Sequence, residues 1–391
     1  MNISSKKIGI VSLVYGSNNY GGILQGYALA KACQKLGYDA KQISIEFSKT
    51  TEQLKNSKEK DLFTRFIKKK TGLKKRFSKY VYYHLLDGNK RGSKFNSFYE
   101  YNIPHTEKVY SISNINETNE LFDSFICGSD VIWQQNNPGM IKDIYYLGFV
   151  ENEKRKIAYA PSFGKNFIPK ENYSRTRELL SRFDALSVRE ESGKKILAEL
   201  GLDSKLVLDP TLLISKDDWL QLCSHGDYFE KKQHYAFAYL LGEIPQNRKS
   251  ITSYCKKANL KLITIPYGIN RFRSMDFSFG DQQILNADPI AFLNLIRNAD
   301  IFFTDSFHGI VFSSIFNVKY WAFPRNKSQH VNSLNTRLEN IVELLGTKDR
   351  YIKADDLYSK NDESINWSQV NRNMATAINN SKEYLKNALS E

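Results

Sequence analysis

The sequence has 391 residues, of which 41% are hydrophobic and 25% are charged, and it carries a formal net charge of +14 at pH 7. This composition excludes a largely disordered chain, and the length exceeds what one hydrophobic core usually supports, so we expect two domains. Apolar runs are too short to span a bilayer, residues 1–7 are too polar for a secretory signal, and the four cysteines lack zinc-site or disulfide-framework spacing. We therefore expect a cytoplasmic protein with reduced thiols.

The first half of the chain alternates short apolar runs with helical patterns, which is typical of parallel sheets joined by crossover helices. We expect strands at residues 8–14, 40–45, 124–127, 156–160, 186–188 and 205–208, and helices at 21–36 and 192–200.

Between residues 49 and 94, lysine and arginine dominate and are interleaved with apolar side chains at roughly helical spacing. Such a basic amphipathic segment is suited to peripheral contact with the inner face of a membrane, or to a polyprenyl-pyrophosphate-linked substrate. The alternative is a solvated helical insertion whose lysines keep it soluble. No zinc-finger, helix-turn-helix or RRM-like signature accompanies the charge, so we do not expect nucleic acid as a partner.

The second half repeats the same alternation from residue 235 onward. We expect strands at 235–241, 261–265, 300–303 and 319–323, and helices at 250–258, 289–297, 309–316, 334–345 and 367–389. The polar stretch 209–233 is the expected linker. We place an N-terminal domain at 1–215 with the basic insertion near 49–100, a C-terminal domain at 216–365, and a C-terminal helix at 366–391 that packs back on the first domain.

Ligands of open α/β sheets bind where strands end and helices begin, so the turns after strands are the places to look for chemistry. The first such turn, 15–22, contains Asn19, Gly21 and Gly22. Its glycines allow close backbone approach, and the helix start offers free N–H groups to an anion; the alternative is a tight turn that needs positive φ. The turn is neither a Rossmann fingerprint nor a P-loop, so nucleotide binding by those modes is not indicated.

A second turn, 127–133, follows the strand at 124–127 and contains Ser129, Asp130 and Trp133. Asp130 is placed to accept a proton from a sugar hydroxyl, and Trp133 to stack on a pyranose ring. The competing interpretation makes Asp130 a helix cap and Trp133 a core residue.

A third turn, 187–190, presents Arg189, which is suited to bidentate capture of a carboxylate or phosphate; the alternative is surface pairing with Glu190.

The fourth turn, at 302–310, combines a strand end with a helix start that favours an anion. We expect His308 to act there as a general acid, with Asp305 or Ser306 available for hydrogen bonds. Arg325 and Arg337 lie downstream, within reach of the same anion.

Six motifs resemble the polysaccharide pyruvyl transferase family in content and in order. They are Asn-Tyr-Gly-Gly-Ile-Leu-Gln-Gly-Tyr-Ala-Leu (19–29), Cys-Gly-Ser-Asp-Val-Ile-Trp (127–133), Tyr-Ala-Pro-Ser-Phe-Gly (159–164), Ser-Val-Arg-Glu (187–190), Leu-Asp-Pro-Thr-Leu-Leu (208–213) and Thr-Asp-Ser-Phe-His-Gly (304–309). The resemblance covers most of the chain except the basic insertion and the stretch after about residue 350.

The resemblance implies two Rossmann-like domains in the GT-B arrangement, with the active site in the interdomain cleft. It also implies transfer of an enolpyruvyl-derived group from phosphoenolpyruvate to a sugar as a cyclic ketal, without a metal or organic cofactor. His308 matches the family's essential histidine, and Arg189 matches an arginine that holds the donor. Many members carry arginine where this chain has Ser306, so another cation (Arg337, Arg325 or Lys165) takes over, or the donor differs.

The turns and the resemblance together give one set of candidate residues. The catalytic candidates are His308, Asp130 and Asp305; the donor-binding candidates are Arg189, Ser306, Phe307, Gly309, Arg325 and Arg337; the acceptor or loop candidates are Asn19, Gly21, Gly22, Ser129, Trp133 and Ser162. The expected acceptor is a sugar of a bacterial-type surface polysaccharide or its lipid-linked precursor. The alternatives are a GT-B nucleotide-sugar glycosyltransferase and a non-catalytic relative that binds glycans or anions.

Overall fold

The computed structural model describes residues 6–46, 88–135, 139, 142–226, 234–268, 273–326, 335–359 and 364–390 of the chain. Residues 47–87, which contain most of the predicted basic segment 49–94, lie outside the described residues.

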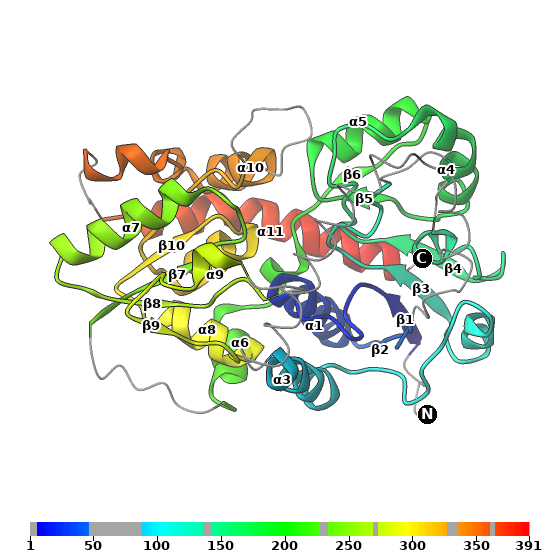
Figure 1. Cartoon of the computed structure of the whole chain (residues 1–391). Coiled ribbons are helices and arrows are strands. Elements are labelled where there is room, and N and C mark those ends of the chain that lie inside the picture. Colours follow the sequence, from blue (N-terminus) through cyan, green and yellow to red (C-terminus); the bar gives the residue numbers. More distant parts are fainter. Residues whose placement is uncertain are drawn as a thin grey trace, which may run out of the picture.

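A sheet of parallel strands forms the centre of the N-terminal half (Figure 1). Its strands are β1 (Lys7–Val11), β2 (Asp39–Gln42), β3 (Ser124–Cys127) and β4 (Arg155–Ala158), in the order β2-β1-β3-β4. A parallel pair, β5 (Ser187–Val188) and β6 (Lys205–Leu206), lies next to β4, to which a bridge between Ile157 and Ala185 connects it. Because the pairings are parallel, the carboxyl ends of all these strands lie at one edge.

A second parallel sheet forms the centre of the C-terminal half. Its strands are β7 (Tyr235–Tyr239), β8 (Lys261–Thr264), β9 (Gln282–Gln283), β10 (Ile301–Thr304) and β11 (Tyr320–Ala322), in the order β11-β10-β7-β8-β9. Every residue of β7 and of β10 is buried, as expected for strands covered by helices on both faces.

Helices connect and cover the strands of both sheets (Figure 1). In the N-terminal half they are α1 (Tyr20–Lys35), α3 (Gly88–Asn102), α4 (Tyr173–Leu180) and α5 (Glu191–Glu199). They continue with α6 (Lys216–Cys223), α7 (Pro245–Lys257), α8 (Pro289–Arg297), α9 (Phe307–Phe316), α10 (Asn335–Leu345) and α11 (Trp367–Ser390). Each strand and helix that the sequence predicts is present, with bounds shifted by a few residues.

The predicted linker 209–233 is wrong in part, because it contains α6. Ser215 and Asp218 form a capping box at the start of this helix, and Trp219 is fully buried, with its ring against Phe312 of α9. The sequence of this stretch is largely polar because one face of α6 is exposed to water. Its other face is buried through Trp219, Leu222 and Cys223.

The first turn of α1 joins the two halves of the molecule. The Tyr20 ring stacks on Phe292 of α8 with 4.3 Å between ring centroids, and its hydroxyl donates to the Ala287 carbonyl at 2.7 Å. The guanidinium of Arg91, from α3, lies over the same ring. These contacts fix the start of α1 against the C-terminal half.

Helix α11 spans both halves (Figure 1). Near its start, Asn373 donates to the carbonyl of Leu345 at the end of α10. Near its end, Tyr384 donates to the Ala158 carbonyl of β4, and the Ser381 hydroxyl accepts a hydrogen bond from the Leu208 amide. None of the described helices combines the length and the apolar character needed to cross a membrane.

Candidate active site

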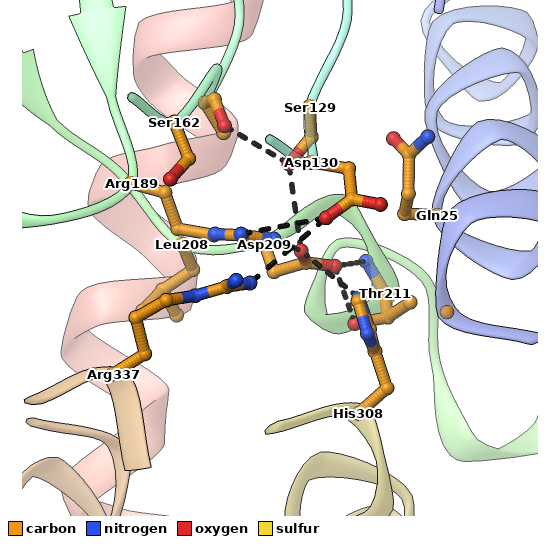
Figure 2. Close-up of polar contacts among 12 residues, drawn as sticks. Gln25, Ser129, Asp130, Ser162, Arg189, Leu208, Asp209, Thr211, His308 and Arg337 are labelled. Carbon is orange, nitrogen blue, oxygen red and sulfur yellow. Dashed lines mark hydrogen bonds and ion pairs between the residues drawn. The ribbon is translucent and has the colours of Figure 1, made fainter. Parts of the chain in front are cut away.

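Asp209 lies at the centre of a buried polar cluster between the two halves (Figure 2). It follows β6 and begins a short 3-10 turn, in which its Oδ1 accepts from the amide of Thr211 at 3.0 Å and the hydroxyl of Thr211 at 2.7 Å. Its Oδ2 accepts from Arg189 Nη1 at 2.5 Å and lies 3.3 Å from His308 Nε2. Burial alone raises the pKa of this carboxyl, but His308 and Arg189 hold it well below its usual range, so the group is ionised.

His308 enters the cluster from the start of α9. Its Nε2 faces Asp209, and its Nδ1 lies against the backbone of Gly21, where an added Cβ atom would be only 1.9 Å away. The imidazole is thus held between a carboxylate and the first turn of α1, both contributed by the N-terminal half. Contact of His308 with the opposite half agrees with the interdomain site that the resemblance implies, but the sequence does not predict these two partners.

Arg189 follows β5 and is almost wholly buried, with its side chain 2% exposed. Besides Asp209, its guanidinium contacts Glu190 Oε1 at 3.1 Å and Asp130 Oδ1 at 3.7 Å. Burial opposes its charge, but these three carboxylates raise the pKa of Arg189 above its ordinary value. Three carboxylates therefore surround this cation, although its buried Nη2 has no hydrogen-bond partner among the described residues.

Arg337 reaches the same space from α10 (Figure 2). Its Nε lies 3.2 Å from Glu190 Oε1 and its Nη2 lies 3.9 Å from Asp130 Oδ1. The guanidinium carbons of Arg337 and Arg189 lie 5.5 and 4.9 Å from the centre of the Phe307 ring. Phe307 therefore holds two cations beside the N-terminus of α9.

Asp130 has a left-handed backbone conformation, with φ of 68°. This conformation is uncommon outside glycine but is tolerated by aspartate and asparagine, and it costs on the order of 1 kcal/mol. The carbonyl of Asp130 accepts from the Ser162 amide at 2.8 Å, which fixes the turn. The carboxylate is thereby directed at Arg189 and Arg337, so this predicted residue lies within the cluster (Figure 2).

Trp133 does not line this site, which corrects the prediction that it stacks on a sugar. Its side chain is fully buried, its ring stacks on Tyr146 at 5.4 Å, and its indole N–H donates to the Tyr145 carbonyl at 3.0 Å. The competing interpretation as a core residue is the right one. Ser162 is also buried, and its hydroxyl accepts from the Gly164 amide.

Asp305 binds the backbone of a neighbouring loop. Its carboxylate accepts from the amides of Leu241 at 2.5 Å and Gly242 at 2.7 Å, just after β7, and burial raises its pKa. These bonds use both oxygens, which argues against a catalytic role for Asp305 and agrees with the prediction that it is available for hydrogen bonds. Arg325 is bonded nearby, where its Nε donates to the Asp305 carbonyl at 3.2 Å.

The remaining candidates shape the turns around the cluster. Ser306 caps α9, with its hydroxyl accepting from the Gly309 amide at 3.4 Å, and Asn19 caps α1 in the same way through the Gly21 amide at 3.2 Å. Ser129 donates to the Ala160 carbonyl and lies 3.4 Å from Asp209. A Cβ atom on Gly22 would lie 3.4 Å from the Asp130 carboxylate, so this glycine borders the site.

Two members of the cluster, Asp209 and Glu190, are absent from the predicted set. Asp209 directly follows the predicted strand 205–208, so the rule that selected the other turns also applies to it. Asp209 is absent from the candidates because it is the first residue of the predicted linker 209–233. The sequence indicates Glu190 only as a surface partner of Arg189, whereas its side chain is buried and contacts both arginines. Within the described ranges, no group of three or more histidine, cysteine, aspartate or glutamate side chains is arranged to hold a metal ion.

Comparison with solved structures defines the class of fold. The S. aureus protein MnaA in complex with UDP is 13% identical, with a TM-score of 0.52 over 99% of this chain and 98% of that one. A UDP-GlcNAc 2-epimerase from Methanocaldococcus jannaschii, in complex with UDP-GlcNAc and UDP, is 11% identical, with a TM-score of 0.50 over 95% and 99%. The fold is therefore GT-B, with two Rossmann-like domains.

A family model narrows this class. The model for polysaccharide pyruvyl transferase matches residues 19–326, and the chain belongs to this family. A search of curated proteins gave no match. The matched region includes Asp130, Arg189, Asp209 and His308, and it ends before Arg337.

Proposed function

We propose that this protein transfers the enolpyruvyl-derived group of phosphoenolpyruvate to two hydroxyls of a sugar, forming a cyclic pyruvate ketal. The acceptor is a sugar of a surface polysaccharide or of its lipid-linked precursor. One observation carries the proposal: His308 and Arg189, from opposite halves, contact the same oxygen of Asp209. An acid and a cation are thereby held within one site between two domains of a pyruvyl transferase.

The charges of the site suit this donor. Phosphoenolpyruvate carries a phosphate and a carboxylate, which require cations and N–H donors. Two guanidinium groups and the N-terminus of α9 meet at Phe307, and a helix start supplies both free amides and a favourable dipole. Arginine is the side chain best suited to planar oxyanions.

His308 is the proposed proton donor. An ionised carboxylate stabilises a neighbouring imidazolium, and Asp209 is ionised at 3.3 Å from Nε2. The proton passes to the methylene carbon of the donor, whose double-bond electrons form the new C–H bond. The adjacent carbon becomes an oxocarbenium-like centre, which the first sugar hydroxyl attacks while losing its proton to a base.

Asp130 is the proposed base, because it is the carboxylate that borders Gly22 while facing the two arginines. The C–O bond to phosphate then breaks, and the second sugar hydroxyl adds to the same carbon to close the ketal. The two hydroxyl protons are balanced by one proton gained at the methyl group and one carried away by phosphate. Stabilising the departing phosphate is the role of the positive charge beside Phe307 and of the N-terminus of α9.

The test is turnover by the purified full-length chain with phosphoenolpyruvate and a panel of free and lipid-linked glycans. Phosphate release should accompany an acceptor mass gain of one pyruvate less one water. His308→Ala should abolish both signals, whereas the exposed His225→Ala should leave them unchanged. Thermal stabilisation by UDP-sugars but not by phosphoenolpyruvate would instead support a nucleotide-sugar glycosyltransferase. Binding without turnover on any acceptor would support a non-catalytic relative.

A further inference from the structure

Arg189 and Arg337 face the same space, but carboxylates neutralise them to different extents (Figure 2). Arg189 hydrogen-bonds Asp209 at 2.5 Å and Glu190 at 3.1 Å. Arg337 has only longer ion pairs, 3.2 Å to Glu190 and 3.9 Å to Asp130. Among the described residues, the buried Nε of Arg337 and the buried Nη2 of Arg189 both lack a partner in hydrogen-bond geometry, but only Arg189 has other nitrogens that donate to carboxylates.

The surroundings of Arg337 favour an additional anion. Burial lowers the pKa of this guanidinium to about 10, and the nearby charges of Arg189 and Arg325 act in the same direction. Glu190 and Asp130 offset this only in part, and both are shared with Arg189. An oxyanion at this point would restore the balance of charge, whereas Arg189 already donates two hydrogen bonds to carboxylates.

Helix α9 contributes no arginine or lysine of its own to this space. At the N-cap of α9 stands Ser306, whose hydroxyl is already used by the Gly309 amide. Arg337 and Arg189 both lie against the ring of Phe307, the first residue of that helix, and so bring positive charge to its N-terminus. Arg337 lies outside the region matched by the family model, residues 19–326.

We propose that Arg337 is the side chain that binds the oxyanion of the donor, and that Arg189 is a positioning residue that holds Asp209 and, through it, His308. The identity of the donor rests on the proposed function, but the division of roles requires only that the donor be an oxyanion. The two arginines then differ in what their removal affects. Loss of Arg337 weakens donor binding, whereas loss of Arg189 lowers the stability of the fold and alters the surroundings of His308.

The experiment compares Arg337→Gln, Arg337→Lys, Arg189→Lys and the exposed control Arg372→Gln in the full-length chain. Binding of phosphoenolpyruvate, inorganic phosphate and pyruvate is measured by calorimetry, and unfolding by circular dichroism. Arg337→Gln should raise the dissociation constant for phosphoenolpyruvate roughly 30-fold, as expected for the loss of charge-assisted hydrogen bonds. Its melting temperature should stay near that of the wild type, because Glu190 keeps its bond to Arg189.

The controls separate binding from structure. Arg337→Lys should recover part of the affinity, and Arg372→Gln should match the wild type. Arg189→Lys should lower the melting temperature and change the NMR titration of His308, with a smaller effect on phosphate binding. Loss of phosphate affinity in Arg337→Gln would assign Arg337 to the phosphate, and loss of pyruvate affinity would assign it to the carboxylate.

The proposal is overturned if Arg337→Gln binds all three anions as the wild type does, or if Arg189→Lys causes the larger loss of affinity at unchanged stability. Binding of inorganic phosphate can be measured whether or not phosphoenolpyruvate is the donor, so this part of the test does not depend on the proposed function. If the wild type binds phosphate but not phosphoenolpyruvate, the donor assignment fails while the roles of the two arginines are still decided.

Discussion

The imidazole of His308 rests directly on the backbone of Gly21, and no side chain fits between them. A Cβ atom on Gly21 would lie 1.9 Å from Nδ1 and 2.5 Å from Cε1 of the ring. The glycine therefore admits a histidine from the opposite half of the molecule. The sequence predicts a glycine that lets a ligand approach, whereas in the structure the group that approaches is His308.

Gly21→Ala should displace His308 and lower turnover by roughly 100-fold or more, the contribution typical of a positioned general acid. Steady-state kinetics with phosphoenolpyruvate would measure the loss, and circular dichroism would check that the fold is kept. Gly92→Ala is the matched control, because its Cβ would have no neighbour closer than 3.8 Å. Full activity in Gly21→Ala would show that the imidazole acts from another position.

Asp209→Asn should destabilise the protein by about 3–5 kcal/mol, because it leaves Arg189 buried beside a neutral amide. Denaturant unfolding would measure the change. Thr211→Val, which removes one donor to the same carboxylate and keeps its charge, should cost only about 1 kcal/mol. Equal effects of the two substitutions would argue against the carboxylate as the centre of the cluster.

The acid stability of the protein should depend on the same carboxylate. The pKa of Asp209 is held below its ordinary value of 3.8, so its stabilising contribution is present above about pH 4 and is lost as the pH falls further. In Asp209→Asn this component should be missing, and its free energy of unfolding should fall less steeply below about pH 4 than that of the wild type. Parallel pH profiles for the two proteins would contradict the assignment.

Asp130→Asn should lower kcat by about 100-fold or more if Asp130 accepts the proton of the sugar hydroxyl. Asparagine tolerates the left-handed backbone at this position, so the substitution changes charge and leaves the turn intact. Binding of phosphoenolpyruvate should not weaken, because one negative charge near Arg337 is removed. An unchanged kcat would remove Asp130 from the role of base.

Trp133→Ala should act on stability, with a loss of about 3–5 kcal/mol, since it empties a buried ring site beside Tyr146. The milder Trp133→Phe should retain most of the packing, and its KM for the acceptor should match the wild type. A raised acceptor KM in Trp133→Phe at unchanged stability would restore the original sugar-stacking interpretation.

Local pattern was sufficient to predict most strands of the two sheets, but not the short edge strand β9. Buried strands such as β3 and helices such as α8 coincide with their predicted bounds, because apolar runs between turn residues encode them directly. The same patterns could not show whether Trp133 faces a ligand or the core. A ligand-facing residue and a core residue can both follow a strand, and an aromatic ring is favoured in either place.

The site itself was predictable one turn at a time. Arg189, Asp130 and His308 each follow or precede an element in a recognisable turn, and the structure brings them together. Asp209 was missed because a proline and a polar stretch after it indicate a linker. The contact of His308 with Gly21 joins positions far apart in the chain, and no local spacing records it.

Helix α11 lies far along the chain from most residues of the site, but it contacts segments on both sides of the site. Its Ser381 hydroxyl holds the amide of Leu208, the residue immediately before Asp209, at 2.9 Å. Its other end is tied to α10, the helix that carries Arg337. One helix therefore sets the spacing between Asp209 and Arg337. Substitutions on the buried face of α11 should lower the rate of the reaction without changing any reacting group.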